Sequence, residues 1–427
     1  HLAHQPDLDG RAFHLTDPNP KTAGELLNLF AKAADAPQAA LRLDSDVTDP
    51  ATSLVRTGLR FFPPAKRAMK MGLNELGIPP GVLNYVNYPT HFDSTETQAV
   101  LAGSGIEVPP LESYAPRIWD YWERNLDPDL FKNHSLSAAV RGKVVLITGA
   151  SSGIGKATAI KVADAGATVL LVARSAEKLE ETKAEIETAG GVAHIHRCDL
   201  SEIEDVERMA EEVLAYHGQV DILVNNAGRS IRRSVGLAYD RFHDYERTIQ
   251  LNYLGAVRLI LALLPSMRER KSGHIINISS IGTQTNPPRF SAYVASKAAL
   301  DAFGRVIASE VFDDGVHITT IHMPLVRTPM IAPTRMYDMF PAITPEEAAE
   351  MIAKAMVGRP KKVATRLGTF GELLYAVAPS VSDRILNTAY KLFPESQAAK
   401  GKGEEAPDKP PTTEAVAFAH LMKGVHW

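Results

Sequence analysis

Hydrophobic positions in the second half of the chain follow two patterns that alternate along the sequence. Short runs rich in β-branched residues, at 144–147 and 168–173, are typical of strands buried on both faces of a parallel sheet. Segments with apolar residues at helical spacing, at 176–188 and 293–311, lie between such runs. From Ser135 onward the alternation occurs six times. It predicts an α/β fold: a doubly wound parallel sheet with right-handed crossovers and a ligand crevice at the carboxyl ends of its strands.

The same patterns place the other elements of this region. Further strands are predicted at 193–197, 221–224, 274–279, 317–323 and 361–365. Further helices are predicted at 202–216, through 251–264, and at 345–356. The apolar segments 373–378 and 385–393 follow. They could cap a hydrophobic pocket or be plain core helices, and the pattern does not separate the two. Residues 395–414 have no large apolar side chain and predict a flexible linker, after which 415–427 could dock back.

The first 135 residues are predicted to be a separate, mixed region. A short strand is expected at 11–15, and a helix from Thr22 through Ala31. The basic amphipathic stretch 54–76 could make peripheral membrane contact, dock on a partner, or cover a core with its cations in water. Residues 88–127 are rich in proline and are predicted to be loop-rich. Because no Gly-rich turn or catalytic set occurs here, we expect an appendage and not an active unit.

Composition narrows the class of protein. The 427 residues are 45% hydrophobic and 22% charged, which is typical of a globular protein with two domains or one extended domain. A net charge of −4 gives no reason to expect nucleic acid. The single cysteine, Cys198, excludes an internal disulfide and predicts a cytoplasmic, reducing location. No metal site is predicted. No apolar run approaches the roughly 18 residues of a membrane span, and the absence of an initiator Met suggests a fragment or a processed product.

A glycine-rich turn follows the first strand of this region. Residues 143–155 read Lys-Val-Val-Leu-Ile-Thr-Gly-Ala-Ser-Ser-Gly-Ile-Gly, so a strand passes through glycines into a helix. Bare backbone allows a pyrophosphate to approach, and the unpaired N–H groups and dipole of the helix attract its charge. Such a turn by itself can also be simple turn geometry. The predicted cofactor contacts here are Gly149, Ser151, Ser152, Gly153, Ile154 and Gly155.

The ends of the next two strands indicate which dinucleotide binds. An acidic residue after the second strand would accept the ribose 2′-OH of NAD. This chain has Arg174 there, with Ser175 and Lys178 close behind. A cation matches a 2′-phosphate, so NADP(H) is predicted. Asp199, with the neighbouring Leu200, is placed to contact the adenine, although Asp-Leu-Ser is also a helix N-cap signal.

Small residues after the fourth strand and a tyrosine–lysine pair are further candidates for the cofactor site and for catalysis. Asn226, Ala227 and Gly228 end the fourth strand, where they let a dinucleotide lie close. Tyr293 and Lys297 are four residues apart and share one helix face. A free tyrosine has a pKa of about 10, and the lysine cation together with an oxidised nicotinamide is expected to lower it.

Two more residues are candidates for catalysis. Ser280 ends the fifth strand and could hydrogen-bond the substrate oxygen, while Asn252 could hold a water that links Lys297 to solvent. Lys297 could also hold the nicotinamide ribose. The predicted catalytic residues are thus Asn252, Ser280, Tyr293 and Lys297.

Several motifs occur together: Thr148-Gly149-x-x-x-Gly153-Ile154-Gly155, Asn225-Asn226-Ala227-Gly228, Ser280, Tyr293 and Lys297. In this combination, over about 140–365, they resemble the short-chain dehydrogenase/reductase superfamily. The resemblance implies a Rossmann-type sheet, NADP(H), a Ser-Tyr-Lys site with Asn252 as its fourth member, and a homodimer or homotetramer. It also implies that Pro324, Val326 and Thr328 lie over the nicotinamide, although Leu325 replaces the usual glycine.

Longer runs resemble a narrower group, the bacterial fatty acyl-CoA reductases. The matching runs are 226–233, 239–244 and 323–334, with the segment Phe393-Pro394. Long members of that group carry two reductase domains. The resemblance implies that 136–394 form an NADP-dependent reductase domain and that 1–135 are the remnant of a preceding reductase domain plus a linker.

This narrower resemblance implies reduction of long-chain acyl-CoA to fatty aldehyde and CoA. Arg229, Arg232 and Arg233 could pair with CoA phosphates or form a solvated basic turn. Met330, with Met336, Met339 and Phe340, could line an acyl channel or simply pack a helix. The enzymatic alternative is a carbonyl reductase that acts on aldehydes or ketones. A second alternative, a cofactor-bound scaffold, is disfavoured by the complete Ser280, Tyr293 and Lys297.

Overall fold

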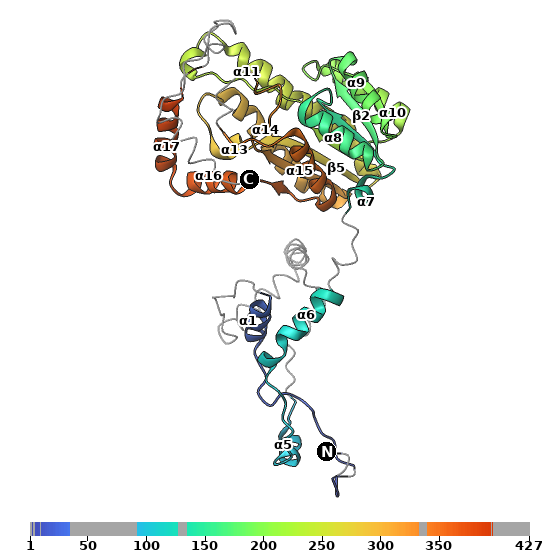
Figure 1. Ribbon diagram of the computed structural model, residues 1–427, viewed down its shortest axis with the longest axis vertical. Coiled ribbons are helices and arrows are strands. Elements are labelled where there is room, and N and C mark those ends of the chain that lie inside the picture. Colours follow the sequence, from blue (N-terminus) through green and yellow to red (C-terminus); the bar gives the residue numbers. More distant parts are fainter. Residues whose placement is uncertain are drawn as a thin grey trace, which may run out of the picture. The chain divides into compact units, whose positions relative to one another are not determined.

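The computed structural model describes residues 2, 5–8, 10–34, 92–126, 135–332, 340–393 and 395 (Figure 1). The chain divides into two units, His1–Lys132 and Asn133–Trp427. The stretch 54–76 lies outside the described residues, as do the linker and the C-terminal segment predicted at 395–427, apart from Glu395.

The second unit is built on a seven-stranded parallel sheet with the order β3-β2-β1-β4-β5-β6-β7. Its strands are β1 Val144–Thr148, β2 Thr168–Ala173, β3 Val192–Arg197, β4 Ile222–Asn225, β5 Gly273–Ser280, β6 Val316–Met323 and β7 Lys362–Val363. The strand order reverses between β1 and β4, which is where open α/β sheets bind ligands. The predicted doubly wound α/β fold is confirmed.

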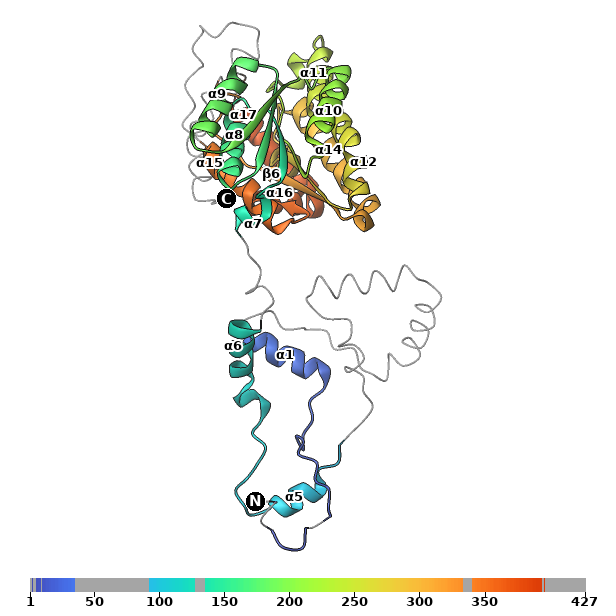
Figure 2. The ribbon, with the colours of Figure 1, turned by 90° about the vertical axis from the view of Figure 1, so that its right-hand side faces the viewer.

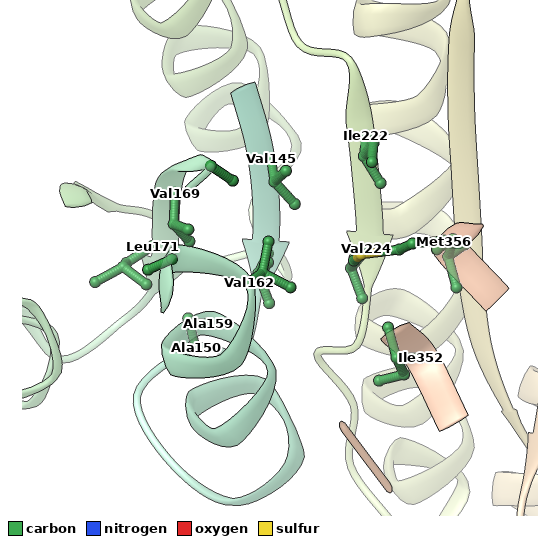
Figure 3. Packing of buried hydrophobic residues seen from close by; sticks show 14 of the residues in the cluster. Val145, Ala150, Ala159, Val162, Val169, Leu171, Ile222, Val224, Ile352 and Met356 are labelled. Atoms are coloured by element: carbon green, nitrogen blue, oxygen red, sulfur yellow. The ribbon is translucent and has the colours of Figure 1, made fainter. Parts of the chain in front are cut away.

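Helices cover both faces of this sheet, as Figure 2 shows. One layer contains α8 Gly153–Asp164, α9 Ala176–Thr188 and α15 Pro345–Gly358, and the other contains α10 Ile203–His217, α12 Ala256–Glu269 and α14 Ser291–Glu310. Along β1, Val145 faces the first layer, where it joins Val162 and Ile352 (Figure 3). Leu146 faces the second layer. Burial on both faces explains why the strand sequences are continuously apolar.

A long helical stretch leads into the second layer. It consists of α11 Phe242–Ile249, the π-helical segment η6 Gln250–Gly255, and α12. Among the described residues, Phe242–Glu269 is long and apolar enough to cross a membrane, so the expectation that no segment approaches this length is wrong. That expectation counted uninterrupted apolar runs, whereas here Arg258 stands among apolar residues. Because Leu259 and Ile260 are fully buried against the sheet, the stretch is a core helix of this fold.

Six further helices complete the described part of the second unit. They are α7 Leu136–Val140, η5 Val235–Leu237, α13 Gly282–Thr285, η7 Phe312–Asp314, α16 Arg366–Val377 and α17 Pro379–Leu392. The apolar segments predicted at 373–378 and 385–393 fall within α16 and α17 or at their ends.

The first unit contains the described helices α1 Ala23–Ala33, α5 Thr95–Leu101, η3 Leu111–Ser113 and α6 Ala115–Asn125. The helix predicted after Thr22 is confirmed, and Thr22 forms a capping box with Glu25. The strand expected at 11–15 is wrong, because no described strand pairs with that segment. The loop-rich prediction for 88–127 is wrong in part. Pro116 lies in the first turn of α6, where its missing N–H costs no hydrogen bond.

Candidate active site

The turn after β1 has the geometry of an anion cradle. Gly149 has φ +68°, and a Cβ there would lie 3.1 Å from the Cα of Ala227. A Cβ on Gly155 would lie 2.2 Å from the carbonyl oxygen of Gly149, so only glycine fits. Ser152 begins α8 without a side-chain cap, which leaves the first N–H groups of the helix for a ligand. The chain therefore fits a bound pyrophosphate at this turn.

The end of β4 is tied to this turn by side-chain hydrogen bonds. Thr148 Oγ1 accepts from the backbone N–H groups of Asn226 and Ala227, each at 3.0 Å. Asn226 Nδ2 donates to the carbonyl of Thr148 at 3.0 Å. Asn225 Nδ2 donates to Asn277 Oδ1 at 2.9 Å, which links β4 to β5. These bonds fix the carboxyl ends of β1, β4 and β5 relative to one another.

A cavity of about 970 Å³ occupies the carboxyl ends of the strands. It brings together nearly all predicted cofactor residues: Gly149, Ser151, Ser152, Gly153, Ile154, Arg174, Ser175, Lys178, Asp199, Leu200, Asn226, Ala227, Gly228, Tyr293, Lys297, Pro324, Val326 and Thr328. Gly155 is not among the lining residues and instead allows the close contact between α8 and the turn.

Arg174 lies at the rim of this cavity with its side chain 64% exposed. Its guanidinium is 3.9 Å from the carboxylate of Asp199, a distance that leaves it available to a stronger anion. Ser175 caps α9 and accepts from the N–H of Lys178. Asp199 does not cap α10, because it accepts from the N–H of Ser201 and Glu202 occupies the cap.

Three of the predicted catalytic residues line the same cavity. Ser280 comes from the end of β5, and Tyr293 and Lys297 come from α14. Lys297 is 4% exposed, and its Nζ donates to the carbonyl of Ile278 at 2.8 Å. Ser280 Oγ accepts from the N–H of Gly282 at 3.0 Å, which fixes the hydroxyl.

Asn252 does not line the cavity and lies behind it, in η6. Its Oδ1 accepts from the N–H of Arg229 at 2.8 Å, and its Nδ2 donates to the carbonyl of Arg229 and to Ser296 Oγ, both at 2.9 Å. A Cβ on Gly228 would lie 3.3 Å from both Asn252 Oδ1 and Lys297 Nζ, so these two side chains flank the same glycine. Asn252 thus joins the turn after β4 to α14, and its water-holding role stays a prediction.

The expected lowering of the tyrosine pKa does not occur in the chain itself. Burial raises the pKa of Tyr293, and its hydrogen bond with Ser280 opposes this only in part. Burial also lowers the pKa of Lys297 to about 8, although the carboxylate of Asp301 favours its charged form. Loss of hydrating water around the phenolate therefore dominates, and the negative charge of Asp301 raises the pKa of Tyr293 further. At neutral pH the phenol stays protonated, which suits a proton donor.

The predicted substrate residues divide into two groups. Arg232 and Met330 line the cavity, whereas Arg229 and Arg233 do not. Arg233 Nε lies 3.2 Å from Asp244, and the pairing of Arg233 with a CoA phosphate stays a prediction. Phe340 lines the cavity, while Met336 and Met339 lie outside the described residues.

Helices α16 and α17 cover the cavity, which decides between the two predicted roles of their segments. They contribute Leu367, Phe370, Gly371, Leu374, Ser382, Ile385, Leu386, Ala389 and Phe393. Arg289, which sequence reasoning missed, lines the cavity too and pairs with Glu395 at 3.0 Å. Its guanidinium also stacks on Tyr390, 4.0 Å from the ring centre, and so ties α17 to the loop before α14. Apolar residues at helical spacing were the available signal for this cover.

Comparison with known proteins shows which protein family this chain belongs to. A family model described as short chain dehydrogenase matches residues 143–337. The chain belongs to the short-chain dehydrogenase family and is an oxidoreductase of that type. Among the described residues, no group of three or more His, Cys, Asp or Glu side chains could hold a metal ion.

Particular relatives extend this result. The chain is 54% identical over 288 residues to a protein of Acinetobacter baylyi named fatty acyl-CoA reductase, covering 67% of this chain and 96% of the relative. It is 51% identical over 316 residues to an uncharacterized oxidoreductase of Mycobacterium tuberculosis, covering 73% and 92%. A crystal structure of a metagenomic short-chain oxidoreductase in complex with NADP is 33% identical, covers 53% of this chain and 98% of that chain, and has a TM-score of 0.47.

Proposed function

We propose that this protein reduces long-chain fatty acyl-CoA thioesters to fatty aldehydes with NADPH. The observation that carries the proposal is a cavity of about 970 Å³ that joins a dinucleotide turn, the Ser280–Tyr293–Lys297 set and an apolar cover. The name of the Acinetobacter baylyi relative, at 54% identity, supports the same substrate class.

NADPH is favoured as the cofactor by the charges at the rim of the cavity. The uncapped N-terminus of α8 would receive the pyrophosphate. Arg174 and Lys178 would meet the 2′-phosphate, which a carboxylate at that place would repel. When bound, NADPH supplies a hydride to the thioester carbonyl carbon, and the C–S bond then breaks, so that acyl-CoA, NADPH and one proton give aldehyde, CoA and NADP⁺.

The chain's own side chains handle the oxygen of the thioester. Tyr293 holds a proton at neutral pH and donates it to this oxygen as negative charge develops there. The hydroxyl of Ser280 donates a hydrogen bond to the same oxygen. When the resulting hemithioacetal collapses, its hydroxyl proton returns to Tyr293, and the departing thiolate takes a proton from solvent. Lys297, held by the carbonyl of Ile278, orients the phenol and the cofactor ribose.

The acyl chain would lie beneath α16 and α17. Phe370, Leu374 and Leu386 present apolar surface to the cavity from these two helices. Pockets that accept lipid chains are lined in this way, with few polar groups away from the reacting centre. The arrangement favours a long acyl chain over a small carbonyl substrate.

Product analysis tests the proposal. The purified protein is incubated with palmitoyl-CoA and NADPH, and fatty aldehyde and free CoA thiol are measured together. Equal amounts of both are expected. Reduction of aldehydes or ketones without any thiol release from acyl-CoA would assign the alternative carbonyl reductase function instead.

A further inference from the structure

Three arginines converge on one buried carboxylate at the start of α11. Asp244 has a side chain that is only 4% exposed. Arg233 Nε and Arg241 Nε each lie 3.2 Å from Asp244 Oδ2, and Arg247 donates to Asp244 Oδ1. His243 Nε2 lies 3.4 Å from Oδ1. We refer to Arg233, Arg241 and Arg247 as the arginine cluster.

The three cations of the arginine cluster share the carboxylate of Asp244. Burial alone would raise the pKa of Asp244, but the hydrogen bonds from Arg247 and Arg241 hold it below its ordinary value, so the group is ionised at neutral pH. Three guanidinium groups then surround one negative charge. Like charges held this close repel one another, and an anionic ligand would remove that cost.

Two members of the arginine cluster can reach such a ligand. Arg241 is 36% exposed and Arg247 is 52% exposed, whereas Arg233 is 14% exposed. Each guanidinium has five N–H donors, and the hydrogen bond of Arg241 or Arg247 to Asp244 uses one of them. Arg233 and Asp244 thus form the base of the site, and the two outer arginines form its face.

The arginine cluster borders the active-site cavity. Arg232, next to Arg233 in the chain, lines that cavity. Tyr245 on α11 shares a hydrogen bond of 2.8 Å with Ser291, two residues before Tyr293. In both views of Figures 1 and 2, α11 lies at the opposite end of the second unit from α16. A ligand that runs from the cavity to the arginine cluster therefore extends away from α16, while Ser234, next to Arg233, donates its backbone N–H to Glu395 just beyond α17.

We propose that Arg241 and Arg247 bind the phosphate groups at the nucleotide end of coenzyme A. This inference rests on the proposed function, because it takes acyl-CoA as the substrate. A thioester places its acyl chain and its pantetheine arm on opposite sides of the reacting carbon. The arm ends in a diphosphate and a 3′-phosphate, which guanidinium groups bind through paired, charge-assisted hydrogen bonds.

A binding experiment tests the site without turnover. Adenosine 3′,5′-bisphosphate is titrated calorimetrically into the full chain saturated with NADP⁺. The wild type and the control Arg268→Gln, an exposed arginine on α12, are expected to bind equally. The double variant Arg241→Gln/Arg247→Gln is expected to bind at least about tenfold more weakly. Equal binding by the double variant, or complete loss of wild-type binding when NADP⁺ is present, would overturn the proposal. The second result would place the ligand in the cofactor's own site.

Kinetics separate this inference from the proposed function. Palmitoyl-CoA is compared with S-palmitoyl pantetheine, which lacks the nucleotide and its phosphates. The double variant is expected to raise KM about tenfold for the first substrate and to change the second by less than about twofold. An equal effect on both substrates would contradict a phosphate site while leaving thioester reduction intact. If the wild type reduces neither substrate, the proposed function fails, and the titration alone judges the site.

A conservative variant distinguishes ligand binding from a structural role. Arg241→Lys/Arg247→Lys keeps both charges but removes the planar fork. It is expected to fold with an unchanged Tm and to recover part of the lost affinity for the bisphosphate. If the Gln and Lys variants both lower Tm and bind equally weakly, the arginine cluster only holds α11 in place.

Discussion

Asp301 lies four residues beyond Lys297 on α14, and both residues are 4% exposed. The Asp301 carboxylate is also 3.7 Å from Nδ1 of His322, which hydrogen-bonds Thr283 Oγ1 at 2.9 Å. Asp301 therefore supplies negative charge beside the buried ammonium of the active site. Burial lowers the pKa of Lys297 to about 8, and Asp301 acts against that shift. The negative charge of this aspartate favours the active-site cation.

The first prediction concerns the pH dependence of turnover. Because a lysine loses its charge as pH rises through its pKa, NADPH-dependent activity should fall as pH rises through about 8. In Asp301→Asn the carboxylate no longer favours the cation, so the fall should begin at lower pH. Glu310→Gln, an exposed carboxylate on the same helix, is the control. Identical pH profiles in all three proteins would refute the role of Asp301.

The second prediction concerns cofactor choice. Arg174→Asp places a carboxylate where the 2′-phosphate would bind, and it should reduce kcat/KM with NADPH by roughly 10- to 100-fold. The value with NADH should stay the same or rise. Initial rates with both cofactors measure the ratio, with Arg305→Asp on α14 as an exposed control. An unchanged preference for NADPH would show that Arg174 does not select the phosphate.

The third prediction concerns stability at the dinucleotide turn. A Cβ on Gly155 would lie 2.2 Å from the carbonyl oxygen of Gly149, and backbone must move to admit it. Gly155→Ala should lower the free energy of unfolding by about 1–3 kcal/mol, measured by denaturant titration. Gly236→Ala meets no atom within 4 Å and should change little. Equal stability of the two variants would mean that the turn is looser than described.

The fourth prediction concerns the part of the cavity beneath α16 and α17, which is proposed to hold the acyl chain. Leu374 lines the cavity on α16, whereas its neighbour Leu373 does not line it and is 60% exposed. Leu374→Trp fills space under the cover and should raise KM for palmitoyl-CoA by about tenfold, which corresponds to about 1.4 kcal/mol, with little effect on butyryl-CoA. Leu373→Trp should affect neither substrate. Chain length would have to be sensed elsewhere if both variants behaved alike.

Much of the fold could be predicted from the sequence because local and global signals agree. Buried parallel strands are continuously apolar, as 144–147 are, and the glycine-rich turn fixes where the first helix begins. The strand expected at 11–15 failed for the complementary reason. An apolar–polar pattern forms a strand only where another strand supplies hydrogen bonds, and the described part of the first unit supplies none.

The candidate site was predictable in its members but not in its electrostatics. Strand ends meet at one edge of a parallel sheet, so Ser280 and Tyr293 could be placed near the glycine turn. The raised pKa of Tyr293 depends on burial, which spacing along a helix does not reveal. The partnership of Arg233 with Asp244 is equally a tertiary contact between a turn and a helix. Sequence reasoning therefore left Arg233 open between a ligand contact and a solvated turn, and it overlooked Arg247.

The central claim is that the phenol of Tyr293 gives its proton to a thioester oxygen in the common cavity. The most direct measurement is the simultaneous assay of aldehyde and free CoA thiol from palmitoyl-CoA and NADPH, with the wild type and Tyr293→Phe. Equimolar products are expected from the wild type. In the variant, turnover should fall by about 10²–10⁴-fold while NADPH binding, followed by fluorescence, is unchanged. Equal turnover by Tyr293→Phe, or no thiol release by the wild type, would contradict the claim.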